Sequence, residues 1–99
     1  MLRLLFSLTS RFLFIALLQD KKCLASICQD NFRQHSEKFF PTLQKILIDT
    51  NFSLKEIGEV YFTDLPGSQT GQRISLAFVL TLQVLSPQIK IWFQTVVKD

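Results

Sequence analysis

The sequence predicts a small α/β domain built on a five-stranded mixed sheet, with two long helices packed on one face. Three short apolar runs at the start are separated by only a few polar residues, which is typical of an antiparallel meander. Two amphipathic segments of helical period follow, and each leads toward a further apolar run. Because crossovers between parallel strands are right-handed, this order predicts the strand order 3-2-1-4-5, with the second strand antiparallel to the others.

The first three strands are expected at residues 2–8, 12–19 and 21–30. The turn-like residues 9–11 separate the first two apolar runs, and two lysines form the bend before the third. Connections this short join strands that are adjacent in a sheet.

The N-terminus also allows a targeting interpretation, because Arg3 and Arg11 flank apolar residues and "FLFIALL" has the length of a short signal-peptide core. Asp20 and two lysines follow, however, where a small-residue cleavage site would stand, and polar residues interrupt any membrane span of about 20 residues. Buried strands explain the same residues, so we expect no membrane association and a cytoplasmic protein. A small exported or membrane-associated protein is the alternative.

The first long helix is expected from about Ser36 to Thr50. Pro41 lies within its first two turns, where a missing N–H group costs least. Its apolar residues share one face of a helical wheel, and the charged residues fall outside that face. The apolar face comprises Phe39, Phe40, Leu43, Ile46 and Leu47.

The segment "SLKE" that follows has the form of a capping box. In such a box, the side chains of Ser53 and Glu56 satisfy free amides at the start of a short helix. Residues 59–64 then predict the fourth strand.

The second long helix is expected from about Thr70 to Leu85, and two apolar stripes run along roughly opposite sides of it. One stripe can cover the sheet, whereas the other needs the first helix or another polypeptide. The first stripe comprises Ile74, Phe78, Leu82 and Leu85, and the second comprises Leu76, Ala77, Leu80 and Val84.

The sequence does not decide which stripe faces outward. We expect Leu76, Leu80 and Val84 to do so, because polar residues border them as the rim of an interface would. Pro87 then ends the helix, and residues 90–97 predict the fifth strand. The rim residues are Gln72, Arg73 and Gln83.

The loop "PGSQTGQR" precedes this helix. Gly67 and Gly71 permit close approach of the backbone, and amides at a helix N-terminus can hold an anion. A P-loop would need a following G-K-[ST], however, and a dinucleotide fingerprint needs three glycines. These residues therefore favour a tight connection over a phosphate site, with Arg73 either an anion contact or a solvent-facing charge.

The 99 residues suffice for one domain and leave little core to spare. Apolar residues make up 47% of the chain and charged residues 19%, with ten Phe, which is more apolar material than a small monomer easily hides. Composition therefore predicts a partner surface. The net charge of +3 comes from scattered Lys and Arg, so it supports nucleic-acid binding only weakly, and we assign it to a solvated surface.

The two cysteines, Cys23 and Cys28, are expected on opposite faces of an extended segment and too far apart for a disulfide. They are then free thiols of a reducing compartment. Together with the single His35 they supply too few ligands for zinc, so we expect no metal and no cofactor.

The stretch "HSEKFFPTLQKILIDTNFSLKEIGEVYFTDLPGSQTGQRISLAF" resembles the first lobe of the TsaB (YeaZ) family. The family pattern is a His that opens a helix, a Leu/Phe-Pro step, a "SLxxI" segment and a strand leading into "GPGSFTGLRIGLA". His35 and Pro41 match the helix, and "LLFSLTS" corresponds weakly to the family's "ILAIDTS" strand. The loop motif is matched by Pro66, Gly67, Ser68, Thr70, Gly71, Arg73 and Ile74.

Three positions depart from the family pattern. Leu65 replaces a glycine, Gln69 replaces the usual Phe, and Leu8 stands where the family strand carries Asp. The wider actin-like ATPase superfamily places that carboxylate near metal and phosphate, so its loss argues against nucleotide chemistry. The second, C-terminal lobe of the family is also expected to be absent.

The resemblance implies a ribonuclease-H-like lobe of the actin-like ATPase type that serves as a scaffold rather than an enzyme. TsaB takes part in making N6-threonylcarbamoyladenosine (t6A) at position 37 of tRNAs that read ANN codons. It pairs with the catalytic paralogue TsaD, while the ATPase TsaE is associated with the machinery, and tRNA is contacted only through the complex. The first-lobe helices of the family form the surface used for homodimerisation and for TsaD binding, and His35 belongs with that surface.

Two other interpretations stay open. The chain is either a degenerate, self-associating remnant without activity or an enzyme whose site the sequence does not reveal. Catalysis has little support, because the single His has no evident Ser or Cys partner and no pair of carboxylates stands out.

Overall fold

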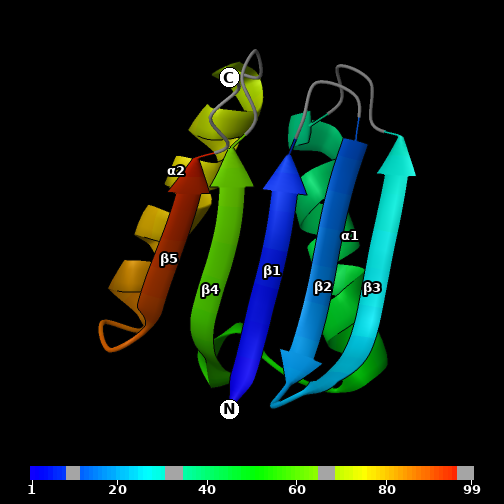
Figure 1. The fold of residues 1–99 in the computed structure, drawn as a ribbon, viewed down its shortest axis with the longest axis vertical. Helices are drawn as coiled ribbons and strands as arrows, with labels where there is room; N and C mark the ends of the chain where they lie inside the picture. Colours follow the sequence, from blue (N-terminus) through cyan, green and yellow to red (C-terminus); the bar gives the residue numbers. More distant parts are fainter. Residues whose placement is uncertain (9–11, 31–34, 65–68, 96–99) are drawn as a thin grey trace.

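The computed structural model describes residues 1–8, 12–30, 35–64 and 69–95, which form one sheet with two long helices on it (Figure 1). The helical elements are α1 (His35–Thr50), the single 3₁₀ turn η1 (Leu54–Glu56) and α2 (Gln69–Leu85). The strands are β1 (Leu2–Leu8), β2 (Phe12–Gln19), β3 (Lys22–Asp30), β4 (Ile57–Asp64) and β5 (Lys90–Thr95).

The five strands lie in the order β3-β2-β1-β4-β5. β2 pairs antiparallel with both β1 and β3, whereas β4 pairs parallel with both β1 and β5. The predicted fold, strand order and strand directions are therefore confirmed.

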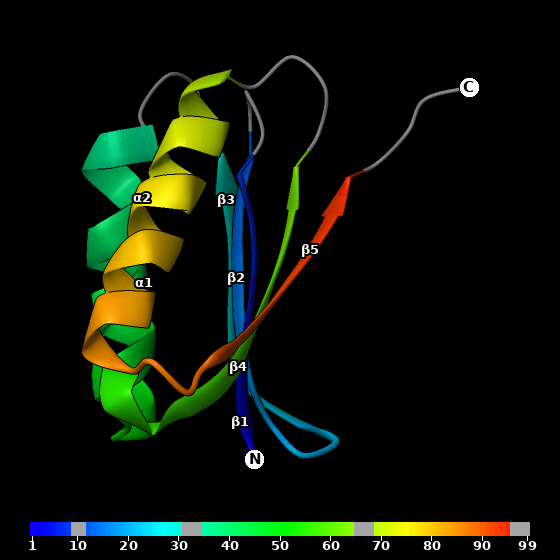
Figure 2. The same ribbon diagram turned by 90° about the vertical axis from the view of Figure 1, so that its left-hand side faces the viewer.

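Both long helices cover the same face of the sheet (Figure 2). Alternate residues of β1 point beneath them, so Leu2, Leu4, Phe6 and Leu8 are buried while the residues between them are partly exposed. Polar contacts tie α1 to β3, since Gln29 donates a hydrogen bond to the Thr42 hydroxyl at 2.9 Å. The helices and the sheet thus form two layers around one core.

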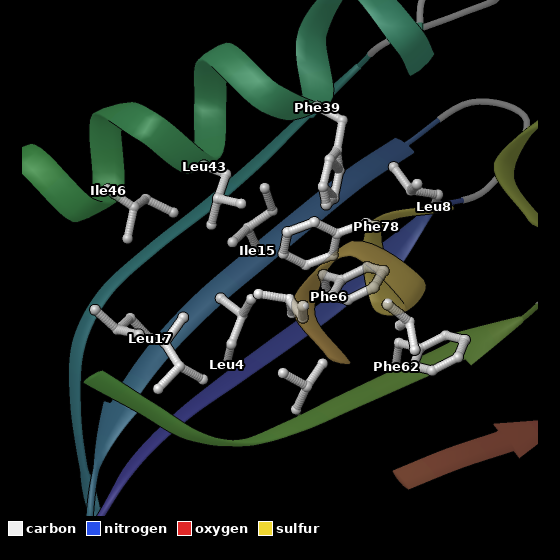
Figure 3. Packing of buried hydrophobic residues seen from close by; sticks show 14 of the residues in the cluster. Leu4, Phe6, Leu8, Ile15, Leu17, Phe39, Leu43, Ile46, Phe62 and Phe78 are labelled. Atoms are coloured by element: carbon white, nitrogen blue, oxygen red, sulfur yellow. The ribbon is translucent and has the colours of Figure 1, made fainter. Parts of the chain in front are cut away.

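Aromatic rings fill the centre of that core (Figure 3). The ring of Phe6 lies 5.2 Å from that of Phe39 on α1, 5.5 Å from Phe78 on α2 and 5.3 Å from Phe62 on β4. The Phe39 and Phe78 rings are themselves 5.1 Å apart in an edge-to-face arrangement, which aromatic pairs favour. One cluster therefore joins both helices to the two central strands.

The predicted capping box is wrong. Ser53 lies at the N-cap of η1 but its side chain caps no backbone amide; its hydroxyl donates instead to the Glu56 carboxylate at 3.4 Å. A single 3₁₀ turn needs no such box, because the Glu56 amide already bonds to the Ser53 carbonyl at 3.1 Å.

Both cysteines are free, as expected, and both are exposed, but the predicted placement on opposite faces is wrong. The register between β2 and β3 shifts at Leu24, so that Leu18 pairs with Cys23 while Phe14 pairs with Cys28. One additional residue in a strand reverses the alternation beyond it. Both cysteines therefore stand on the sheet face opposite the helices.

The aromatic cluster yields a test with a matched pair of neighbouring residues. Phe39 is fully buried, whereas Phe40 is 49% exposed on the same helix. We expect Phe39→Ala to lower the free energy of unfolding by about 3–5 kcal/mol and Phe40→Ala by about 1 kcal/mol, because only the first leaves a closed cavity. Urea denaturation measures both, and equal losses would contradict this description of the core.

Candidate interaction surface

The helix α2 has one buried side and one exposed apolar side. Phe78 and Leu82 are buried against the sheet. Leu76, Leu80 and Val84 are 56%, 61% and 81% exposed on the other side, where we expected an outward stripe. We call these three residues the α2 stripe.

The predicted inward stripe needs one correction. Ile74 is partly buried, and Phe78 and Leu82 are buried, but Leu85 is 49% exposed. The residue one helical turn after Leu82 on the buried side is Ser86 rather than Leu85. Ser86 is 5% exposed, and its amide donates a hydrogen bond to the Leu82 carbonyl at 2.8 Å.

Two buried residues of α2 were missed by the sequence analysis, namely Ser75 and Val79. Both lie three or four residues from Phe78 or Leu82, so the helical spacing was present in the sequence. Ser75 interrupts the apolar pattern, and Val79 lies between the two proposed stripes.

The helix α2 carries few charged residues for a helix with one exposed side. Arg73, which is exposed, is its only charged residue, and Gln83 is exposed as expected of a rim residue. The hydroxyl of Thr81 donates to the Ala77 carbonyl at 2.9 Å, so this exposed polar group has a partner within the helix. An apolar, almost uncharged exposed surface of this kind is typical of a protein interface.

Several predicted site residues lie outside what the structure describes. Pro66, Gly67 and Ser68 fall between two described ranges. Thr70 and Gly71 belong to the first turn of α2, and Gln72 to the next residues, but their side chains are not described. The same holds for the side chain of His35 at the start of α1, so an anion site at the loop stays a prediction.

The sheet face away from the helices carries a second group of side chains, arranged in rows by the strand register. Arg3, Glu59 and Lys90 pair across β1, β4 and β5, because the register shift at Gly58 brings Glu59 opposite Arg3. Arg3 Nε lies 3.7 Å from Glu59 Oε2. Tyr61 donates its hydroxyl hydrogen to the same carboxylate oxygen at 2.5 Å.

The next row on this face is apolar and aromatic. Leu5 pairs with Tyr61, and Tyr61 pairs with Trp92. The hydrogen bond that Tyr61 donates to Glu59, reinforced by partial burial, raises the pKa of the phenol above its usual value, because ionisation would place two negative charges side by side.

No group of three or more His, Cys, Asp or Glu residues that would hold a metal ion is present in the part of the chain that the structure describes. Within the same residues, no helix has both the length and the apolar character needed to cross a bilayer.

Comparison with known proteins gives consistent matches. Residues 27–87 match the family model described as TsaD: tRNA N6-adenosine threonylcarbamoyltransferase. The chain is 34% identical over 64 residues to the "tRNA threonylcarbamoyladenosine biosynthesis protein TsaB" of Buchnera aphidicola subsp. Schizaphis graminum, a match that covers 65% of this chain and 30% of that protein.

Solved structures show the same fold. YeaZ from Pseudomonas aeruginosa superposes with a TM-score of 0.83 at 22% identity, covering 95% of this chain and 43% of that one. A second structure, of a protein with similarity to peptidase YEAZ from Pseudomonas aeruginosa, gives a TM-score of 0.82 over the same shares. This chain thus spans less than half the length of these relatives.

The Tyr61 pKa can be measured directly, because Tyr61 is the only tyrosine of the chain. We expect Glu59→Gln to lower the pKa toward the ordinary value, since a neutral amide removes the repulsion that opposes ionisation. Ultraviolet absorbance titration measures the change. Glu56→Gln, an exposed substitution of the same kind in η1, should leave the pKa unchanged, and an equal fall in both variants would contradict the assigned cause.

Proposed function

Since the chain belongs to the TsaD family and is of the TsaB type, we propose that it is a non-catalytic interaction subunit in the synthesis of N6-threonylcarbamoyladenosine in tRNA. Its partner is a TsaD-like protein, and a TsaE-like ATPase and tRNA take part through the resulting complex. The names of the family and of the Buchnera relative support a part in t6A synthesis. The exposed apolar surface of α2 supports the role of an interaction subunit.

The α2 stripe is the observation that carries this proposal. Full burial of one of these three side chains in an apolar contact contributes roughly 1.5–3 kcal/mol to binding. The contribution is smaller by the fraction of the side chain that is already buried in the free chain. Together these gains are comparable with the whole stability of a small domain. A partner that covers the stripe would therefore stabilise the chain and itself be bound tightly.

A second copy of the chain is the other occupant that this surface fits. Helices with an uncharged apolar stripe can pack against each other across a twofold axis, where the same surface of both copies is used and every contact occurs twice. Self-association and TsaD binding would then compete for the α2 stripe, and the same substitutions would weaken both.

The absence of catalysis is part of the proposal. Leu8 is buried at the carboxyl end of β1, and an apolar side chain at this position supplies no ligand for the metal that a bound nucleotide needs. The loop amides at Pro66–Arg73 would at most hold a simple anion.

We expect Leu80→Asp to weaken binding of a TsaD-like protein from the same organism at least about 100-fold, because it removes an apolar contact and buries a charge. Isothermal titration calorimetry measures the affinity, and sedimentation measures self-association. The fold should remain intact, since Leu80 is exposed, whereas Phe78→Asp should unfold the domain.

Trp92→Ala serves as the control for this experiment, since Trp92 lies on β5 and its ring packs against Tyr61 of β4. It should bind the TsaD-like protein as the unchanged chain does. A chain that is monomeric at high concentration and ignores the TsaD-like protein would instead be the degenerate remnant.

We also expect no metal-dependent ATP turnover by the purified chain, because Leu8 stands where the strand of the family carries the Asp that a nucleotide-bound metal needs. A phosphate-release assay with Mg²⁺ tests this. Turnover that disappears when Gly67 is changed to Ala would show that the chain is an ATPase and would overturn this part of the proposal.

A further inference from the structure

The strand β3 forms one edge of the sheet, and its outer side pairs with no other strand that the structure describes (Figure 1). Alternate N–H and C=O groups along such an edge point outward, where they can pair with another strand. A strand that followed β5 would pair with β5 rather than with β3, because strands that follow each other in a chain are usually neighbours in a sheet. The edge of β3 is therefore the one that a strand of another molecule can use.

For an edge strand, β3 is long and has little protection against pairing. It runs over nine residues, and the stretch from Cys23 to Gln29 contains no charged residue and no proline. Natural edge strands usually avoid pairing by being short or by carrying lysine or proline. Protection here is limited to the bulge at Leu24, where β3 meets β2. An edge of this kind favours a partner strand that accommodates the bulge.

A second copy of β3, running antiparallel about Ser26, matches this edge. The two Ser26 residues then lie opposite each other, and Ala25 of each copy lies opposite Ile27 of the other. Ala25 and Ile27 pack against the core on the side of the helices, whereas Ser26 is exposed on the other side. Each residue thus meets one from the same face of the sheet, and the two apolar pairs extend the core across the contact.

The bulge brings the cysteines into the same alignment. In the pairing with β2, Leu24 is an additional residue that the alternation skips, so Ala25 and Cys23 meet neighbouring residues of β2. When a second copy passes the bulge in the same way, Cys23 of one copy lies opposite Cys28 of the other. Both cysteines are exposed on the face away from the helices. Opposite side chains of an antiparallel pair have Cβ atoms about 4.5–5.5 Å apart, which is close to the separation in a disulfide.

The charges at the ends of β3 favour the antiparallel direction. Lys21 and Lys22 stand at its start, and Asp30 stands at its end. An antiparallel copy places the lysines of each chain near the aspartate of the other, whereas a parallel copy in register places like charges together. Charge thus selects the direction, and the uncharged middle of the strand supplies the pairing.

The two long helices leave room for such a pair. The helix α1 contacts β2 and β3, whereas α2 contacts β1 and β4 and lies toward the other edge (Figure 1). With strands about 4.8 Å apart in a continuous sheet, the two copies of α1 lie about 10 Å apart on the same face. This is near the usual distance between packed helices.

We propose that two copies of this chain pair antiparallel along β3 and form one continuous sheet, with Cys23 of each copy opposite Cys28 of the other. The matching bulge and the matching cysteine positions favour a second copy over a strand of a different protein. The α2 stripe of each copy stays uncovered, so the pair presents two sites for the TsaD-like protein. The pairing goes beyond the proposed function and does not rest on it.

Cys23 and Cys28 provide the test, because they are the only cysteines of the chain. The Leu80→Asp chain, in which self-association through the α2 stripe is removed, should form a disulfide-linked dimer when diamide is added. Two thiols lose two electrons and two protons, and diamide takes these up as it is reduced to the hydrazine.

Two single variants in the same background separate this contact from random collision. Cys23→Ser and Cys28→Ser should each give little linked dimer, because neither cysteine lies opposite its own counterpart. An equal mixture of the two variants should restore the linked dimer, since one chain then supplies Cys28 and the other supplies Cys23. Gel electrophoresis without a reducing agent measures all three samples.

Ser26→Lys tests the pairing without the thiols. It places two lysines opposite each other at the centre of the contact, so we expect self-association, measured by sedimentation, to weaken at least about 10-fold. Ser53→Lys makes the same change at an exposed site before η1 and should leave self-association unchanged. Ser26→Lys should also leave binding of the TsaD-like protein unchanged, so failure of this inference and failure of the proposed function are separate results.

Single-cysteine variants that cross-link as well as the chain with both cysteines would overturn the inference. Equal losses with Ser26→Lys and Ser53→Lys, or a Leu80→Asp chain that stays monomeric at high concentration, would overturn it as well. Protection of both thiols of the unchanged chain from alkylation by the TsaD-like protein, without any dimer, would assign the edge to that protein instead. If Ser26→Lys does not fold, the mixture of cysteine variants still decides.

Discussion

Contact between the Phe6 ring and the rings of Phe39 and Phe78 determines how both helices lie on the sheet. Each helix contributes one phenylalanine to the same point above the central strand, so neither can rotate without opening a cavity in a closely packed core. The rotation of α2 then follows. With Phe78 and Leu82 held against the sheet, Leu80 and Val84 must face away from it. The exposed stripe is therefore a consequence of the core.

The architecture was predictable because its signals are local and periodic. The strand order follows from short connections, from two amphipathic segments and from the handedness of crossovers, and each of these is visible in the sequence. The errors occurred where the period changes. The shift at Leu24 moved Cys23 to the face of Cys28, and the drift of the helical period placed Ser86 rather than Leu85 against the core. No residue type in the sequence indicates the extra residue at Leu24 or the burial of Ser86, since both depend on how a strand or helix packs against the neighbouring elements.

The two surfaces differ in how far the sequence indicated them. Both sides of α2 are apolar, so the sequence identified the stripes but not the direction in which they face; burial of the large Phe78 ring settles that direction. The sheet face away from the helices gave almost no signal in the sequence. Tyr61 and Trp92 each lie within three consecutive apolar residues, and only the strand register shows that they form one row beside the row of Arg3, Glu59 and Lys90. Arg3, Glu59 and Lys90, which are far apart in the sequence, become one row of charged side chains only in the folded sheet.

The position of β1 at the centre of the sheet has a consequence for the order of folding. One edge of β1 pairs with β2 across a short connection, while the other pairs in parallel with β4, so that Leu4 meets Val60 far along the chain. Pairing between residues so distant in sequence is slow, because a long loop must close first. During synthesis the meander of β1, β2 and β3 therefore forms before the completed sheet. The backbone edge of β1 that pairs with β4 stays unpaired until α1 and β4 have emerged. Because an unpaired strand edge can pair with another chain, a newly made chain is most prone to aggregate during this interval.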